Sequence, residues 1–136
     1  MRNLPTDLEI LNVIYNDYYE EFSNYMKEKN NTRSVKIYVP INIDKIAEKL
    51  NVDGDIIFGR LYYHLEKKYG YRNEDESNVH FFARVLDGDI HCINFPLMAS
   101  ILADLRDNKK RYYTAITIAV GSLIVSLISV AISIIR

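Results

Sequence analysis

The sequence predicts an α+β domain followed by one transmembrane helix. Apolar residues recur at helical spacing in several segments, apolar and polar residues alternate over 35–43, and residues 112–135 carry no charge, whereas charges occur throughout the rest of the 136 residues. This length suffices for one domain and one membrane helix. We expect a domain over 1–105, a basic juxtamembrane segment over 106–111 and a transmembrane helix over 112–135.

The first predicted helix begins after Thr6, which can cap it, and Glu9 completes a capping box. Apolar residues then recur at helical spacing until the polar run 27–34 ends the helix: Leu8, Leu11, Ile14, Tyr15, Tyr18, Phe22, Tyr25 and Met26.

A half-buried strand is predicted over 35–43, where apolar and other residues alternate. Pro40 has no backbone donor, so this strand should lie at a sheet edge or leave its ladder at that residue.

Two helices joined by a short turn should follow. Asp44 can cap a helix over 45–50, residues 51–54 form a turn, and a longer helix covers 55–69 before Gly70 ends it. The apolar face of the longer helix comprises Ile57, Phe58, Leu61, Tyr62 and Leu65.

The remaining part of the domain should contain a hairpin and a last helix. Strands are expected over 79–86 and 90–95, on either side of an Asp-Gly turn at 87–89, after an acidic loop over 73–78. A last helix should begin at Pro96 and lead into the apolar segment, with its inward face formed by Leu97, Met98, Ile101, Leu102 and Leu105.

The order helix, strand, helix, helix, hairpin, helix resembles a winged helix-turn-helix domain over about residues 5–105. Ala47, Asn51 and Ile57 fall where that motif has a small, a turn and a buried apolar residue. Arg60 stands where the motif has another apolar residue, which is a departure. The block 59–65 is also similar to one in small bacterial proteins, a similarity that implies no function.

The resemblance implies that the second helix of the pair presents a recognition face: Arg60, Tyr63, His64 and Lys67. Against DNA as the ligand, residues 1–105 have a net charge of −5, and the turn at the wing tip carries Asp87 and Asp89. We therefore expect this face to bind a protein, with a membrane-bound DNA-binding regulator as one alternative and a merely solvated helix face as another.

The uncharged segment 112–135 is long enough to span a bilayer. As a helix its 24 residues extend about 36 Å, against a hydrocarbon core of about 30 Å. Its twelve Ile, Leu and Val residues contribute about −4 to −7 kcal/mol to insertion. The alternative is a helix buried in a soluble core, which would require a domain of about 110 residues to cover it on all sides.

The flanking charges predict the orientation of this helix. Four basic residues precede it and only Arg136 follows it, so the positive-inside rule places residues 1–111 in the cytoplasm of a single-pass, tail-anchored protein of the inner membrane. Tyr112 and Tyr113 suit the headgroup level. The basic residues are Arg106, Lys109, Lys110 and Arg111.

Small residues form a stripe along the apolar helix at spacings of four and three: Ala115, Ala119, Ser122, Ser126, Ser129 and Ser133. Small residues allow helices to approach closely, so the stripe predicts self-association or pairing with another membrane helix. The alternatives are an accidental alignment and an oligomeric pore lined by serines, as in a membrane-permeabilising effector.

The sequence motivates no catalysis, metal or cofactor. His80 and His91 are candidates for cross-strand neighbours beside Cys92, but His91 and Cys92 are adjacent on a strand and point to opposite faces. Cys92 is expected to be a small buried residue. The leading hypothesis is a membrane-tethered, non-enzymatic interaction module that contacts the lipid bilayer, further copies or another membrane helix, and a cytoplasmic protein.

Overall fold

The structure is a computed structural model that describes residues 3–26, 33, 35–85 and 90–136. It divides into two units, Met1–Leu102 and Ala103–Arg136, which are described separately. The predicted hairpin turn at 87–89 lies outside the described residues.

Helix α1 (Asp7–Ser23) begins as predicted, because Thr6 and Glu9 form the capping box. The Thr6 N–H donates to the Glu9 carboxylate at 2.7 Å, and the Glu9 N–H donates to the Thr6 hydroxyl at 3.3 Å. Ile10, Leu11 and Ile14 are buried. The helix ends at Ser23, three residues before the predicted end at Met26.

Helix α2 (Ile43–Leu50) begins two residues earlier than predicted. Its cap is Asn42, whose side-chain oxygen accepts the Lys45 N–H at 2.9 Å, so the predicted cap Asp44 lies in the first turn instead. Asn51 ends the helix in the left-handed region, at φ 52°, which Asn adopts more readily than most residues.

The second helix of the pair is continuous from residue 54 to residue 69 but not uniform. It consists of α3 (Gly54–Gly59), a π-helical segment η1 (Arg60–Glu66) and a last turn α4 (Lys67–Tyr69). Its cap is Asp53, whose carboxylate accepts the Asp55 N–H at 2.9 Å. A side chain at Gly54 would come within 2.7 Å of the Asp44 carboxylate.

Three antiparallel strands form the main sheet in the order β1-β5-β4, with β1 (Tyr38–Ile41), β4 (Phe82–Val85) and β5 (Ile90–Asn94). Strand β1 is shorter than predicted, but it lies at a sheet edge, as Pro40 indicated. The predicted strand 79–86 is interrupted at residues 80–81. Its first part belongs to a separate two-stranded sheet of β2 (Tyr71–Arg72) and β3 (Asn78–Val79), which was not predicted.

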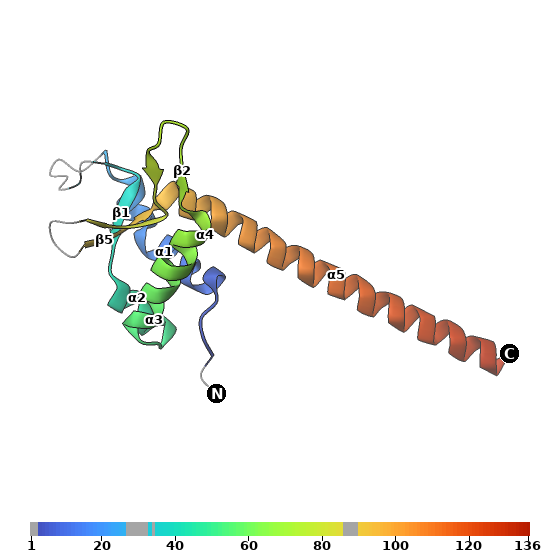
Figure 1. The fold of residues 1–136 in the computed structure, drawn as a ribbon. Helices are drawn as coiled ribbons and strands as arrows, with labels where there is room; N and C mark the ends of the chain where they lie inside the picture. Colours follow the sequence, from blue (N-terminus) through green and yellow to red (C-terminus); the bar gives the residue numbers. More distant parts are fainter. Residues whose placement is uncertain (1–2, 27–32, 34, 86–89) are drawn as a thin grey trace. The chain divides into compact units, whose positions relative to one another are not determined.

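The core lies among the helices and the main sheet of the first unit, with the first turns of α5 (Phe95–Ile135) against it (Figure 1). Phe95 begins this helix rather than ending β5 as predicted. The domain is therefore a mixed helix-and-sheet fold. Its largest fully buried side chains include Ile10, Leu11, Ile14, Ile46, Ile57, Leu61, Leu65, Phe81, Phe82, Ile93, Phe95 and Met98.

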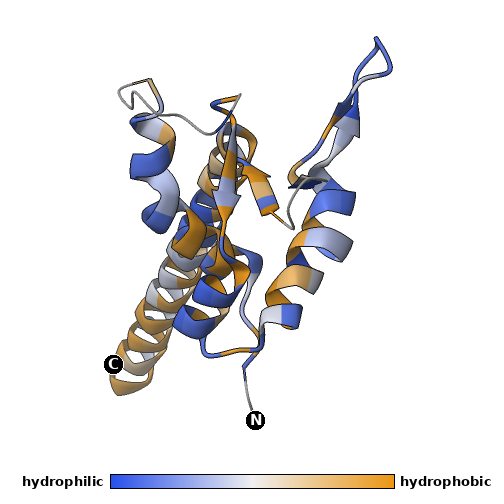
Figure 2. Ribbon diagram, turned by 90° about the vertical axis from the view of Figure 1, so that its left-hand side faces the viewer, coloured by the Kyte–Doolittle hydropathy of each residue, from blue (hydrophilic) through white to orange (hydrophobic). Residues whose placement is uncertain are grey.

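The 41 residues of α5 continue without a break into the apolar segment, as the sequence indicated. Among the described residues, α5 is the one helix long and apolar enough to cross a membrane. Figure 2 shows the hydrophobic colour along its C-terminal part. Residues 112–135 are all exposed, whereas the core helix of a soluble protein would be mostly buried.

Candidate functional site

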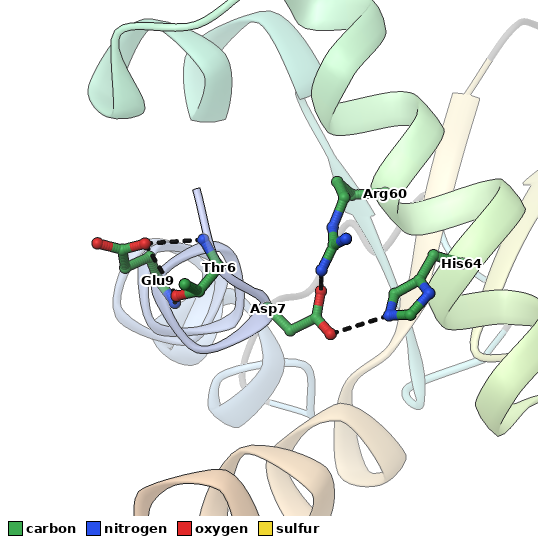
Figure 3. Close-up of polar contacts among 5 residues, drawn as sticks. All are labelled: Thr6, Asp7, Glu9, Arg60 and His64. Carbon is green, nitrogen blue, oxygen red and sulfur yellow. Dashed lines mark hydrogen bonds and ion pairs between the residues drawn. The ribbon is translucent and has the colours of Figure 1, made fainter. Parts of the chain in front are cut away.

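The structure divides the predicted recognition face into two parts. Arg60 and His64 turn toward α1, where both contact the carboxylate of Asp7 (Figure 3). The Arg60 guanidinium pairs with one oxygen of Asp7, and His64 Nε2 lies 3.1 Å from the other oxygen. Tyr63 and Lys67 belong to the other part and are exposed.

Asp7 is well placed to bind both side chains because it is the first residue of α1, beside the Thr6 cap. Its side chain is 17% exposed, and Arg60 Nε is buried without a hydrogen-bond partner among the described residues. The ion pair between Arg60 and Asp7 joins the helix 54–69 to α1.

Tyr63 and Lys67 border a groove between the helix 54–69 and strand β4. Its volume is about 450 Å³, and its walls include Tyr62 and Arg84 as well. We call this the tyrosine groove, defined by Tyr62, Tyr63, Lys67 and Arg84. Tyr63 is 70% exposed and Tyr62 is 48% exposed, so two neighbouring aromatic rings reach solvent along one rim.

Glu66 fixes the two walls of the groove to each other. One oxygen of its carboxylate accepts the Phe82 N–H at 2.7 Å, and the other lies 2.7 Å from His80 Nδ1. Glu66 is on η1, while Phe82 is on β4. A side chain at Gly70 would come within 2.8 Å of the Glu66 carboxylate, so glycine leaves space for this contact.

The exposed tyrosines rest on an aromatic cluster. Phe58 stacks on Tyr62 with ring centroids 5.4 Å apart, and Tyr63 meets Tyr62 edge to face at 5.1 Å. Phe58 also meets Phe82 of β4 at 6.0 Å, which links the cluster to the sheet. Such contacts hold the rings in place before any partner binds, which lowers the entropy lost on binding.

Sequence reasoning missed part of this site. It placed Tyr62 on the apolar face, whereas Tyr62 is 48% exposed and its ring stacks on Phe58. It did not single out Glu66 or Arg84, which lie on different elements.

The expectation that His80 and His91 are cross-strand neighbours is wrong. Arg84 lies opposite His91 on β4, and the His80 ring contacts Glu66. Cys92 is 5% exposed, as expected of a small buried residue, and burial raises the pKa of its thiol. The described residues contain no group of three or more potential metal ligands.

The serines of the small-residue stripe bond to their own helix. The hydroxyls of Ser122, Ser126, Ser129 and Ser133 each donate to the carbonyl four residues earlier, at 2.9–3.0 Å. The stripe therefore presents small side chains whose donors already have acceptors within the helix. All six stripe residues are exposed in this chain.

Comparison of the chain with models of protein families, with curated proteins and with solved structures gives no match.

Proposed function

We propose that this chain is a membrane-anchored, non-enzymatic protein-recognition module. Its domain binds a protein partner in the tyrosine groove, and residues 112–135 hold that domain at the bilayer. The observation that carries the recognition half of this proposal is the pair of exposed rings, Tyr62 and Tyr63, on the rim of the groove. Tyr and Arg are among the residue types that contribute most to the binding energy of protein interfaces.

The order of elements supports a winged-helix interpretation of the domain. Helix α2 is joined to the helix 54–69 by a short turn after Asn51, and β4 and β5 follow in the chain. In this interpretation the helix 54–69 is the recognition helix and β4–β5 is the wing. The tyrosine groove then lies between the recognition helix and the wing.

Charge favours a protein over DNA as the ligand. Residues 1–105 have a net charge of −5, and the floor of the groove contains the carboxylate of Glu66. Arg60, which would contact phosphate on the DNA interpretation, pairs with Asp7 instead. A DNA-binding surface requires several cations that face the phosphates.

The groove is tested by site-specific photo-crosslinking of the full chain in cell membranes. A photoreactive residue in place of Tyr63 should capture a discrete protein partner, and Lys67→Glu should reduce that product. The matched control is the same residue in place of Tyr71, which is also exposed but lies on β2, outside the groove. Equal capture at both positions, or none at Tyr63, would count against the groove.

The DNA alternative has its own assay. We expect the full chain in detergent to bind no duplex DNA at low salt. Binding that weakens steeply as salt rises would show that DNA, and not a protein, is the ligand. Such salt dependence arises because contacts with phosphates release counterions from the DNA.

Two features support the membrane half of the proposal. Residues 112–135 are uncharged and exposed, and the basic residues of 106–111 precede them. The positive-inside rule then places the domain in the cytoplasm. Protease added to intact spheroplasts should leave the domain uncut, and the same protease added to inverted vesicles should digest it. Digestion in intact spheroplasts would mean that the domain lies on the outer side of the membrane.

A further inference from the structure

The segment just before the apolar span has two different faces. A helix turns about 100° per residue, so Lys109, Lys110 and Tyr113 fall within an arc of about 100°. Asp104, Asp107 and Arg111 fall on the other side. The six residues all belong to the unit Ala103–Arg136, and all are exposed. We call the first group the basic face.

The charges of the two faces differ in their pairing. Arg111 Nε lies 2.8 Å from Asp107 Oδ2, so these two exposed side chains form an ion pair within the helix. Lys109 and Lys110 form no ion pair with any described residue of the chain. The two lysine charges of the basic face are therefore available for an external anion.

The depth of these residues matches that of phospholipid phosphates. Lys110 and Lys109 lie two and three residues before Tyr112, which is about 3 and 4.5 Å along the helix. The polar interfacial layer of a bilayer is about 5–8 Å deep on each side of the hydrocarbon core. Long lysine side chains extend their charged ends into this layer while their methylene groups stay near apolar surface. Tyr113, on the same face, suits the boundary itself.

We propose that the basic face binds the head groups of anionic phospholipids in the cytoplasmic leaflet. This inference rests on the proposed insertion of residues 112–135. A lipid head group and free phosphate both offer a phosphate anion, and the lipid is the source that we propose. The pairing of Arg111 with Asp107 leaves that arginine outside the site, so the four basic residues of the segment are not equivalent.

The test measures lipid association with the full chain reconstituted in phosphatidylcholine vesicles that contain a minor fraction of phosphatidylglycerol. Spin-labelled versions of the two lipids report which one is held next to the protein. We expect a preference of roughly fivefold for phosphatidylglycerol, the size of a single Lys contact at an anionic surface, and its decline as salt rises.

Lys110→Gln and Arg111→Gln form a matched pair, because each substitution removes one positive charge. Lys110→Gln should reduce the preference for phosphatidylglycerol, whereas Arg111→Gln at the next residue should leave most of it. Lys109→Gln should act like Lys110→Gln. An equal loss in the Arg111 and Lys110 variants would overturn the basic face, and so would a wild-type chain without any lipid preference.

Two further measurements separate the possible causes. Inorganic phosphate should reduce the lipid preference no more than chloride at equal ionic strength, and a larger reduction by phosphate would assign the face to free phosphate instead. Resistance to carbonate extraction from pure phosphatidylcholine vesicles reports insertion alone. Loss of that resistance would reject the anchor, whereas resistant protein without a lipid preference would reject only the basic face.

Discussion

Asp7 holds two side chains of the helix 54–69 on α1 through a single carboxylate. Asp7→Asn removes the charge that Arg60 requires and weakens the contact with His64. Hydrogen bonds to charged groups contribute about 1.5–3 kcal/mol, and partial exposure of Arg60 reduces that figure. We expect a loss of about 1–2 kcal/mol in the free energy of unfolding, measured by urea denaturation of the full chain in detergent.

The control for this variant is Glu74→Gln, which removes the same charge from an exposed turn. Its free energy of unfolding should change by less than about 0.5 kcal/mol. Equal effects of the two substitutions would mean that the chain responds to net charge and not to the Asp7 contact.

Cys92 illustrates the chemical consequence of burial at a single residue. Burial raises the pKa of the thiol, so a smaller fraction is present as the reactive thiolate at any pH below that pKa. Folded protein at neutral pH should therefore react slowly with Ellman's reagent, and the rate should rise when the chain unfolds. The reference is a chain with Cys92→Ala and Ser100→Cys, since Ser100 is exposed. A similar rate for both thiols would contradict the buried position.

At the scale of elements, the stripe on α5 can be tested by side-chain size. Its serine hydroxyls already donate to the carbonyls four residues earlier, so they have little left to donate to a second helix. Association should then depend on close approach. Replacing Ser122, Ser126 and Ser129 by Ala should preserve oligomers in membrane crosslinking, and replacing them by Ile should abolish them.

The same pair of variants distinguishes the alternatives. Loss of oligomers with Ala would mean that the hydroxyls form bonds between helices. Oligomers that persist with Ile would mean that the small residues align by accident.

The helix 54–69 shows how one irregular element shapes a surface. Gly54–Gly59 is α-helical and Arg60–Glu66 is π-helical, and the π-helical segment contains the two exposed tyrosines Tyr62 and Tyr63. The same segment directs Arg60 toward Asp7 and Glu66 toward β4. π-Helical segments occur frequently at functional sites, in agreement with the position of the tyrosine groove.

At the scale of the whole molecule, the proposed anchor depends on a modest insertion free energy. The apolar residues of 112–135 contribute about −4 to −7 kcal/mol, and one Asp at the centre of a membrane helix costs about 2.5–3.5 kcal/mol. Leu123→Asp with Ile124→Asp should therefore prevent insertion, seen as protein released by carbonate extraction. Ile134→Asp with Ile135→Asp, at the end of the span, should remain inserted. Retention of both variants would contradict a membrane-spanning helix.

The sequence alone determined the features that depend on neighbours along the chain. The Thr6–Glu9 capping box and the long apolar helix follow from local spacing, whereas Pro40 left two possibilities for β1, of which the structure shows the sheet edge. The start of α2 was predicted two residues too late because Asn42 and Asp44 are both good caps, and local sequence does not distinguish them.

Only the tertiary structure decided which contacts the residues of the predicted recognition face form. Arg60 and His64 remain partly exposed, but both contact Asp7, which lies 53 and 57 residues away in sequence and adjacent in space. The tyrosine groove likewise needs Glu66 of η1 to bond Phe82 of β4. Contacts between distant segments leave no periodic pattern in the sequence, since each partner satisfies only its own local rules.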